Sequence, residues 1–313
     1  MWAHLFKQHY VFPVMRLTGL VRRQLKRLCS GAALLFVAAG LVSCSSGFVY
    51  QNLDWVIPWY LDDYVELNEE QQAQFDTVIE QALAWHKTEE LPRYHQYLET
   101  VYLKLDQPLS EEDMAGIQTF ASASFSSIQQ RIVPELLPLS KTLDTDQQAD
   151  IWDELTKKQT EYEEEFLSRT DEEYVEELNE KYTKFLERFL GTLSEEQASI
   201  IAARVETIIR ADDLWLRARQ AWLNTIKREY EAQGREAEGK ELEVEGADWL
   251  ARMQAAWLNR DQHYSKADKL TIDTRDQQAR ALLLAVMNTR SKEQSDHFKA
   301  FIRDWQAKFT RWQ

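Results

Sequence analysis

The chain has 313 residues, and its 52 Asp and Glu against 37 Lys and Arg give a formal net charge of −15. Such an acidic chain repels nucleic acids, so we expect neither DNA nor RNA as a partner. The low content of Gly (nine) and Pro (six) and the lack of alternating Val, Ile and Thr runs argue against a sandwich or barrel and predict an all-α fold.

An export signal is predicted over residues 1–43. Four basic residues between positions 22 and 27 precede an apolar segment over residues 28–42. That segment is shorter than the about 20 apolar residues that a transmembrane helix needs. It ends in Leu41-Val42-Ser43-Cys44, the pattern of a bacterial lipobox. Met15 is an alternative start, which would place the basic residues at the head of the signal.

We expect cleavage between Ser43 and Cys44 and a covalent lipid on Cys44, with no other cofactor. Ser45 follows, and by resemblance to the lipoprotein sorting rule a residue other than Asp there favours the periplasmic face of the outer membrane over retention in the inner membrane. Residues 1–43 hold six of the basic side chains and no acidic one, so the rest of the chain carries a formal charge of −21. That part has no second cysteine, which excludes an internal disulfide.

The remaining chain divides into four predicted parts. A lipidated tether over residues 44–53 precedes a main helical bundle over residues 54–232. An acidic linker over residues 233–246, with several Glu and Gly, then leads to a C-terminal helical segment over residues 247–313. We expect this last segment to pack on the bundle.

Several helix starts share a pattern in which an apolar residue precedes Asn, Ser or Asp, and Gln or Asp follows three positions later. The first polar residue can cap the helix, the later side chain can bond back to it, and acids between them face the positive helix end. The pattern occurs at Leu67-Asn68, Leu109-Ser110, Leu143-Asp144 and Leu193-Ser194, with a looser copy at Ile272-Asp273. The uneven spacing predicts successive helical hairpins and no regular solenoid.

Apolar residues spaced by three and four predict the buried faces of the helices. The longest such stripe covers residues 201–226 and predicts one long helix. Shorter stripes cover residues 91–105, 174–189 and 298–312. Together these patterns predict an irregular multi-helix bundle built from helical hairpins.

His86 and Glu90 lie four residues apart, on one helical face, and His95 follows Pro92, at which we expect the helix to break. A kink there can bring two imidazoles and a carboxylate together as metal ligands. A histidine that caps a helix or bonds a neighbouring acid is the commoner arrangement. We therefore predict no metal site and keep these three residues as the weak candidates for one.

The adjacent acids Asp62-Asp63 and Asp212-Asp213 are the candidates for hydrolysis, because two carboxyl groups across a cleft can cut glycosidic bonds such as those of peptidoglycan. Neighbouring residues on a helix do not face each other, and a chain this acidic carries many solvated acids. We therefore expect no catalytic residue and no enzyme.

Ten of the 11 tryptophans follow the expected cleavage site. Trp215 and Trp222 fall on one helical face, as do Trp249 and Trp257. Tryptophans in this arrangement either fill the core between helices or line a groove for an apolar ligand. Both interpretations remain open, and these four residues are the candidate groove.

The chain resembles a known family over most of its length after the lipobox, with the signatures before residue 95. They are Asn52-Leu53-Asp54-Trp55, Tyr60-Leu61-Asp62-Asp63-Tyr64-Val65-Glu66-Leu67 with Gln71, Trp85-His86-Lys87 and Glu89-Glu90-Leu91-Pro92-Arg93-Tyr94. In these residues it is similar to uncharacterised Gram-negative lipoproteins catalogued as a domain of unknown function. The resemblance implies a helical lipoprotein and supplies no catalytic residue.

The Leu-x-x-x-Gln helix starts also resemble the LTxxQ motif of the Spy/CpxP family, at a weaker level. Members of that family are small periplasmic all-helical proteins that respond to envelope stress and can act as chaperones. Here Asn, Asp or Ser replaces the threonine, and the chain is much longer. The resemblance implies a chaperone-like role.

These observations predict an outer-membrane-anchored periplasmic lipoprotein with a non-catalytic binding or chaperone-like function. Its expected partners are the membrane, through the acyl chains, and an envelope protein or an unfolded client. Trp55 and Trp59, close to the lipid, are candidates for contact with the membrane interface. A peptidoglycan-active hydrolase and a structural subunit of an envelope complex are the alternative hypotheses.

Overall fold

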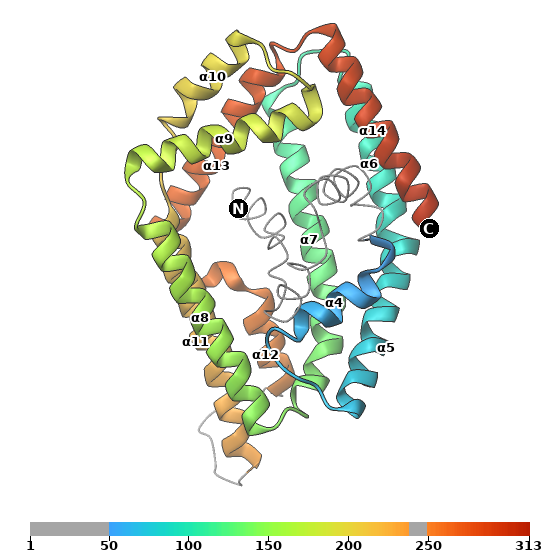
Figure 1. The fold of residues 1–313 in the computed structure, drawn as a ribbon, viewed down its shortest axis with the longest axis vertical. Helices are drawn as coiled ribbons and strands as arrows, with labels where there is room; N and C mark the ends of the chain where they lie inside the picture. The colour runs from blue at the N-terminus through green and yellow to red at the C-terminus, as the bar shows by residue number, and fades with distance from the viewer. Residues whose placement is uncertain (1–49, 238–248) are drawn as a thin grey trace, which may run out of the picture. The chain divides into compact units, whose positions relative to one another are not determined.

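The computed structural model describes residues 50–237 and 249–313, and within these two ranges it contains helices and turns but no strand (Figure 1). The prediction of an all-α, multi-helix bundle is confirmed. The signal, the lipobox with Cys44, and residues 238–248 of the expected linker lie outside the described residues.

Two compact units divide the chain, Met1–Trp59 and Tyr60–Gln313, and every helix after α4 belongs to the second. In chain order the elements are α4 (Leu53–Leu61), α5 (Glu69–Trp85), the π-helix η1 (His86–Glu90), α6 (Leu91–Lys104), α7 (Glu111–Ser140), α8 (Thr145–Leu167), α9 (Asp171–Leu190), α10 (Glu195–Val205), α11 (Asp212–Ala237), α12 (Trp249–Leu258), the 3-10 helix η2 (Arg260–His263), α13 (Lys266–Met287) and α14 (Lys292–Trp312). Within the ranges that the structure describes, no helix combines the length and apolar character that a bilayer crossing requires.

The four main helix starts are confirmed as capping boxes. In each, the side chain of the first polar residue accepts the N–H three residues later, and the later side chain bonds back to the cap N–H. The caps are Asn68, Ser110, Asp144 and Ser194. These local bonds fix where α5, α7, α8 and α10 begin.

The looser copy of the pattern at Ile272-Asp273 is wrong as a helix start, because it lies inside α13. That helix begins at Lys266, where Ser265 and Asp268 form the capping box. The same device starts α9 and α14, without a preceding leucine to mark it in the sequence.

Glutamines from different capping boxes also bind each other in pairs, which we call glutamine clasps. In the first clasp, the side-chain amides of Gln71 and Gln147 donate to each other, with N–O distances of 3.0 and 2.7 Å. Gln71 also donates to the carbonyl oxygen of Thr142, and Gln147 to that of Glu66. The clasp therefore joins the start of α5 to the start of α8.

The second clasp joins α10 to α14. The amides of Gln197 and Gln294 donate to each other at 2.8 Å, and Gln294 also donates to the carbonyl oxygen of Thr192 at 2.9 Å. Gln197 is fully buried. The repeated motif thus stabilises contacts between helix ends that lie far apart in the sequence.

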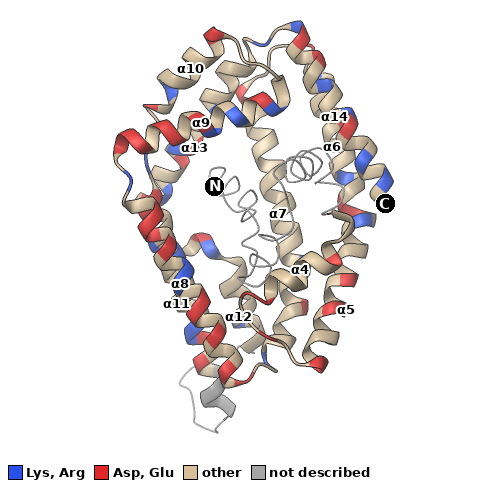
Figure 2. Cartoon of the chain, viewed as in Figure 1, with Lys and Arg blue, Asp and Glu red and all other residues tan. Residues whose placement is uncertain are grey.

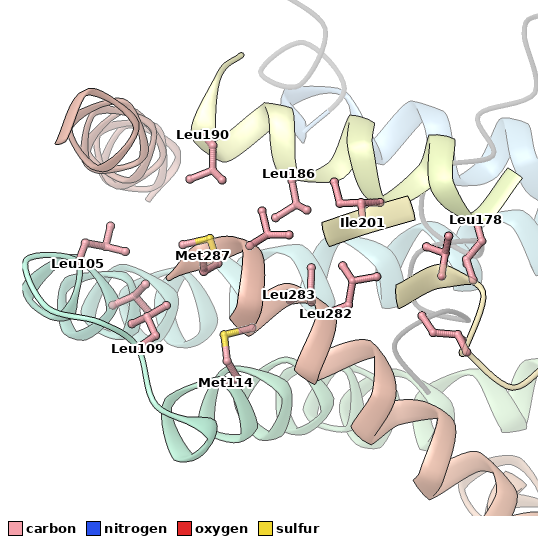
Figure 3. Close-up of a cluster of buried hydrophobic side chains, with 14 of the residues drawn as sticks. Leu105, Leu109, Met114, Leu178, Leu186, Leu190, Ile201, Leu282, Leu283 and Met287 are labelled. Atoms are coloured by element: carbon pink, nitrogen blue, oxygen red, sulfur yellow. The ribbon is translucent and has the colours of Figure 1, made fainter. Parts of the chain in front are cut away.

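The larger cluster of buried apolar side chains is built by α6, the first turn of α7, α9, α10, α13 and α14. It comprises Val101, Leu105, Leu109, Met114, Tyr174, Leu178, Leu186, Leu190, Ile201, Val205, Ile208, Leu282, Leu283, Val286, Met287 and Ile302. In Figure 3, Leu186 and Leu190 of α9 point toward Leu282, Leu283 and Met287 of α13. Burial of these side chains is the main source of stability in this part of the fold.

A smaller cluster lies at the other end of α7, where α11 and α12 pack. It comprises Leu137, Trp222, Leu223, Ile226, Trp249, Met253 and Ala256, with side chains of α8 packed against it. Helix α7 has 30 residues and contributes to both clusters, so it is the element that connects them. In Figure 1, α11 runs beside α8 and α14 runs beside α6.

The prediction of one long helix over residues 201–226 is wrong, because α10 ends at Val205 and α11 begins at Asp212. The side chain of Gln278 on α13 replaces helical bonds at the bend. It accepts the N–H of Ile209 at 3.0 Å and donates to the carbonyl oxygen of Thr207 at 2.7 Å. The stripe stays buried through the bend, so its spacing does not reveal the break.

Helix α11 continues to Ala237, past Gln233, where the linker was expected to begin. After the linker, α12 packs on α7 and α11, α13 packs on α7 and α10, and α14 packs on α6 and α9.

Candidate functional site

The polar residues singled out around His86 lie where the π-helix η1 connects α5 to α6. The chain stays helical from Glu69 to Lys104, so the expected break at Pro92 is wrong. In the π turn the N–H of Leu91 bonds to the carbonyl oxygen of His86. This wider turn accommodates a proline, which has no N–H to donate, in the first turn of α6.

Glu90 is the buried centre of this region, with 3% of its surface exposed. Its carboxylate accepts hydrogen bonds from Arg93 and, at 2.8 Å, from the hydroxyl of Ser127 on α7. Arg93 also donates to the hydroxyl oxygen of Ser124 at 3.0 Å. These bonds join η1 and α6 to α7. The roles of Arg93, Ser124 and Ser127 in these bonds were not predicted from the sequence. The run of small residues from Ala121 in α7 was the available signal.

The surroundings favour the charged form of Glu90 and the neutral form of His86. Burial raises the pKa of the Glu90 carboxyl, but hydrogen bonds from Arg93, Ser127 and Tyr94 outweigh it, so the pKa lies below its ordinary value. Burial lowers the pKa of His86, and the Glu90 charge opposes this only in part. Both pKa values are therefore shifted away from pH 7, whereas the pKa of an efficient general acid or base lies near the working pH.

The metal candidates are not brought together as a ligand set. His86 packs against the ring of Tyr94, with centroids 5.5 Å apart. The carbonyl oxygen of His95 accepts a bond from Gln306 on α14. Across the described residues, no three or more His, Cys, Asp or Glu side chains gather in a group that can hold a metal ion.

The paired acids lie in two different settings. Asp62 and Asp63 are exposed in the turn after α4. Asp212 and Asp213 occupy the first turn of α11, and Asp212 accepts a bond from Arg169 at 2.6 Å. Asp212 is therefore held in an ion pair that fixes the turn between α8 and α9 against the start of α11.

The four candidate groove tryptophans divide into two kinds. Trp222 and Trp249 are buried, 7% and 3% exposed, and each donates its indole N–H to a backbone carbonyl oxygen, at 3.0 and 2.8 Å. Trp215 and Trp257 are half-buried, and Trp257 packs edge-on against Trp222 at 5.1 Å. Two of the four thus fill the smaller cluster, Trp257 packs against it, and Trp215 packs against Tyr162 and Phe166 of α8.

Acidic side chains are dense on α8 and α9, where Figure 2 shows repeated red segments. Residues 161–180 contain one basic residue, Arg169, among many Asp and Glu. A shallow hollow there is lined by Ser168, Arg169, Glu173, Glu176, Glu177 and Glu180. A surface of this charge favours basic partners over anionic ones.

A family model described as "Family of unknown function (DUF6279)" matches residues 63–260, more than half of the chain. No curated protein and no solved structure matches the chain. The match confirms the expected likeness to a domain family of unknown function, and it includes the signature residues from Asp63 to Tyr94.

Proposed function

The chain belongs to the DUF6279 family, and on that premise we propose that it is a lipid-anchored envelope protein that works by binding and not by catalysis. Its anchor is an acylated Cys44, exposed by cleavage after Ser43, and its place is the periplasmic face of the outer membrane. The lipobox and Ser45 support this location.

One observation carries the binding function: the polar residues best suited to chemistry are bonded into contacts between helices. Glu90 binds Arg93 and Ser127, and Asp212 binds Arg169. A carboxylate whose oxygens are bonded in this way stabilises helix packing and is not free to move protons in a reaction. The helices then serve as a scaffold that presents a surface.

The binding surface in this proposal is the aromatic face of α11 and α12. Trp215 and Trp257 are half-buried on these helices, and Trp257 packs against the buried Trp222. An apolar stretch of an unfolded envelope protein fits such a face, and acids elsewhere on the protein attract basic flanking segments. The likeness of the helix starts to the Spy/CpxP motif supports a chaperone-like role.

An aggregation assay with reduced α-lactalbumin as client tests this function. Wild-type protein should suppress light scattering of the client, and a variant with both Trp215→Ala and Trp257→Ala should lose most of that effect. Trp305→Ala removes another half-buried tryptophan, on α14, and is the matched control. Failure of the wild type to suppress aggregation would reject the chaperone-like role.

The two alternative functions give different results in further assays. Clearing of peptidoglycan in a zymogram by the whole chain, lost in Asp212→Asn, would replace binding by hydrolysis. A structural subunit would be favoured by two results together. The protein would have no effect on the client or on peptidoglycan, and an envelope protein would crosslink to it in cells and co-purify with it.

Helix α4 supports attachment near the membrane. None of its residues is buried, and Trp55 and Trp59 are 61% and 46% exposed, with ring centroids 6.4 Å apart. Tryptophans prefer the interface between headgroups and acyl chains. A Cys44→Ala chain, which cannot be acylated, should bind vesicles poorly, because the acyl chains provide most of the attachment. Tight binding of that variant would contradict anchoring by the lipid.

A further inference from the structure

Helix α4 carries a concentration of exposed aromatic side chains. Trp55, Trp59 and Tyr60 are 61%, 46% and 48% exposed, and they are three of the six large apolar side chains that are exposed in the described part of the chain. The other three lie singly on three other helices. Soluble proteins rarely leave a contiguous apolar patch uncovered, so the patch on α4 calls for an occupant.

The two tryptophans form one face of α4. They lie four residues apart, a spacing that places side chains next to each other on a helix. Their rings are stacked, with centroids 6.4 Å apart and planes at 15°. The hydroxyl groups of Tyr60 and Tyr64 lie 3.1 Å apart, so the polar end of Tyr60 has a hydrogen-bond partner. The aromatic face is therefore ordered before anything covers it.

The length of α4 restricts how it can meet a bilayer. Its nine residues rise about 14 Å, against a hydrocarbon core about 30 Å thick, so it cannot cross. Asp54 is its only charged residue. A short apolar helix with tryptophans can lie in the boundary between headgroups and acyl chains, with its axis in the plane of the membrane.

The charges around α4 decide which lipid it fits. No Lys or Arg occurs between Cys44 and Lys87, whereas residues 44–86 hold eight Asp and Glu. In Figure 2 no part of α4 is blue. Interfacial helices that bind anionic membranes carry Lys and Arg on their polar face, and α4 has none. Its acidic surroundings repel anionic headgroups, so a zwitterionic surface is the complementary one.

The proposed lipid anchor brings α4 within reach of the membrane, and the inference rests on that anchor. Leu53 follows Cys44 by nine residues, and a fully extended chain of that length spans at most about 30 Å. A tether this short keeps α4 at a high effective concentration near the bilayer. A contact that is weak by itself is therefore sufficient once the chain is acylated.

We propose that α4 is a second membrane contact, which lies in the interface of zwitterionic phospholipid and disfavours anionic lipid. Trp55 and Trp59 enter the boundary, and the acids Asp54, Asp62 and Asp63 stay on the water side. The inference deepens the proposed function, because it names the lipid class and the side chains that touch it. Client binding by α11 and α12 is independent of this contact.

Quenching of tryptophan fluorescence by brominated lipid tests the contact. The acylated whole chain is reconstituted in phosphatidylcholine vesicles whose acyl chains carry bromine near the headgroup end. Fluorescence should fall relative to vesicles without bromine. A variant with both Trp55→Phe and Trp59→Phe keeps two apolar rings and should lose most of the quenching. Trp305→Phe, on α14, is the matched control and should retain it.

Vesicles in which phosphatidylglycerol replaces part of the phosphatidylcholine test the lipid class. Quenching should decrease there at low salt and recover at high salt, because salt screens the repulsion. The proposal is overturned if the acylated chain stays on the vesicles without quenching, if the double variant is quenched like the wild type, or if phosphatidylglycerol strengthens the quenching at low salt.

Two further results separate this contact from its alternatives. A dimer that becomes monomeric in the double variant, without quenching in the wild type, would assign α4 to a second copy of the chain and overturn the proposal. A Cys44→Ala chain that binds vesicles as tightly as the wild type would reject the lipid anchor and, with it, the argument from the tether. Retained anchoring with no quenching rejects the contact of α4 alone.

Discussion

Glu90 and Arg275 are both buried charged residues, 3% and 7% exposed, and their surroundings differ. The oxygens of Glu90 accept bonds from Arg93 and Ser127, which come from two helices. Two nitrogen atoms of Arg275, Nε and Nη1, are buried without a hydrogen-bond partner. A satisfied buried charge fixes helix packing, whereas an unsatisfied one lowers stability. The bonds of Glu90 therefore stabilise the contact between α6 and α7, whereas the buried charge of Arg275 makes no comparable contribution.

The largest effect on the free energy of unfolding is expected from a substitution in the larger apolar cluster, and the effects at the two charged residues can be compared with it. Leu282→Ala removes a fully buried side chain of α13 and should lower the free energy of unfolding by about 2–5 kcal/mol. Leu270→Ala, on the same helix but 69% exposed, should change it by less than about 0.5 kcal/mol. Urea denaturation measures both, and equal losses would mean that the packing of α13 is incorrectly described.

Glu90→Gln should have the next largest effect. The substitution keeps the side-chain shape but removes the charge that Arg93 and Ser127 bind, so the free energy of unfolding should fall by about 2 kcal/mol at pH 7. Glu89→Gln, at the adjacent exposed position, is the control and should be near neutral.

The pH dependence of the same variant distinguishes a charged Glu90 from a merely well-packed one. Because the pKa of Glu90 in the folded protein lies below its ordinary value of 4.5, its contribution is present above pH 4.5 and is lost as the pH falls through the lowered pKa. The stability difference between wild type and Glu90→Gln should therefore shrink on acidification. A difference that stays constant with pH would show that the charge does not contribute.

A smaller loss of stability is expected when a glutamine clasp is removed. The clasp side chains, like that of Glu90, are polar and have hydrogen-bond partners. Gln71→Ala should cost about 1 kcal/mol, because it removes the side-chain oxygen that accepts the N–H of Asn68 and the bonds to Gln147 and Thr142. Gln74→Ala, exposed on the same helix, should cost almost nothing. If both variants have the wild-type midpoint in urea, the clasp does not stabilise the contact between α5 and α8.

The features that sequence predicted correctly are local. The cap at Asn68 and its partner Gln71 lie within one helical turn, so their bonds can be deduced from spacing alone. The start of α13 was missed because Tyr264, and not a leucine as in the four copies that were found, precedes Ser265. Local signals thus located four helix starts, those of α5, α7, α8 and α10, although the pairing of glutamines across the fold depends on tertiary contacts.

The features that sequence could not predict depend on distant partners. The bend before Asp212 is held by Gln278, which comes from another helix, and the apolar spacing continues across it. Arg275 lies in a polar stretch of α13 that is typical of a solvated face, but it is buried in the fold, 7% exposed. His86 and Glu90 are on one face as expected, but their partners on α6 and α7 determine their chemistry.

The most direct test is the free energy of unfolding of Arg275→Gln in ligand-free buffer, beside wild type and Arg280→Gln. Because Arg275 is buried without an acidic partner, its replacement should leave stability unchanged or raise it by up to about 1 kcal/mol. Arg280→Gln removes a paired arginine and should lower stability by up to about 1 kcal/mol. A clear loss of stability in Arg275→Gln, larger than that in Arg280→Gln, would contradict the distinction between a satisfied and an unsatisfied buried charge.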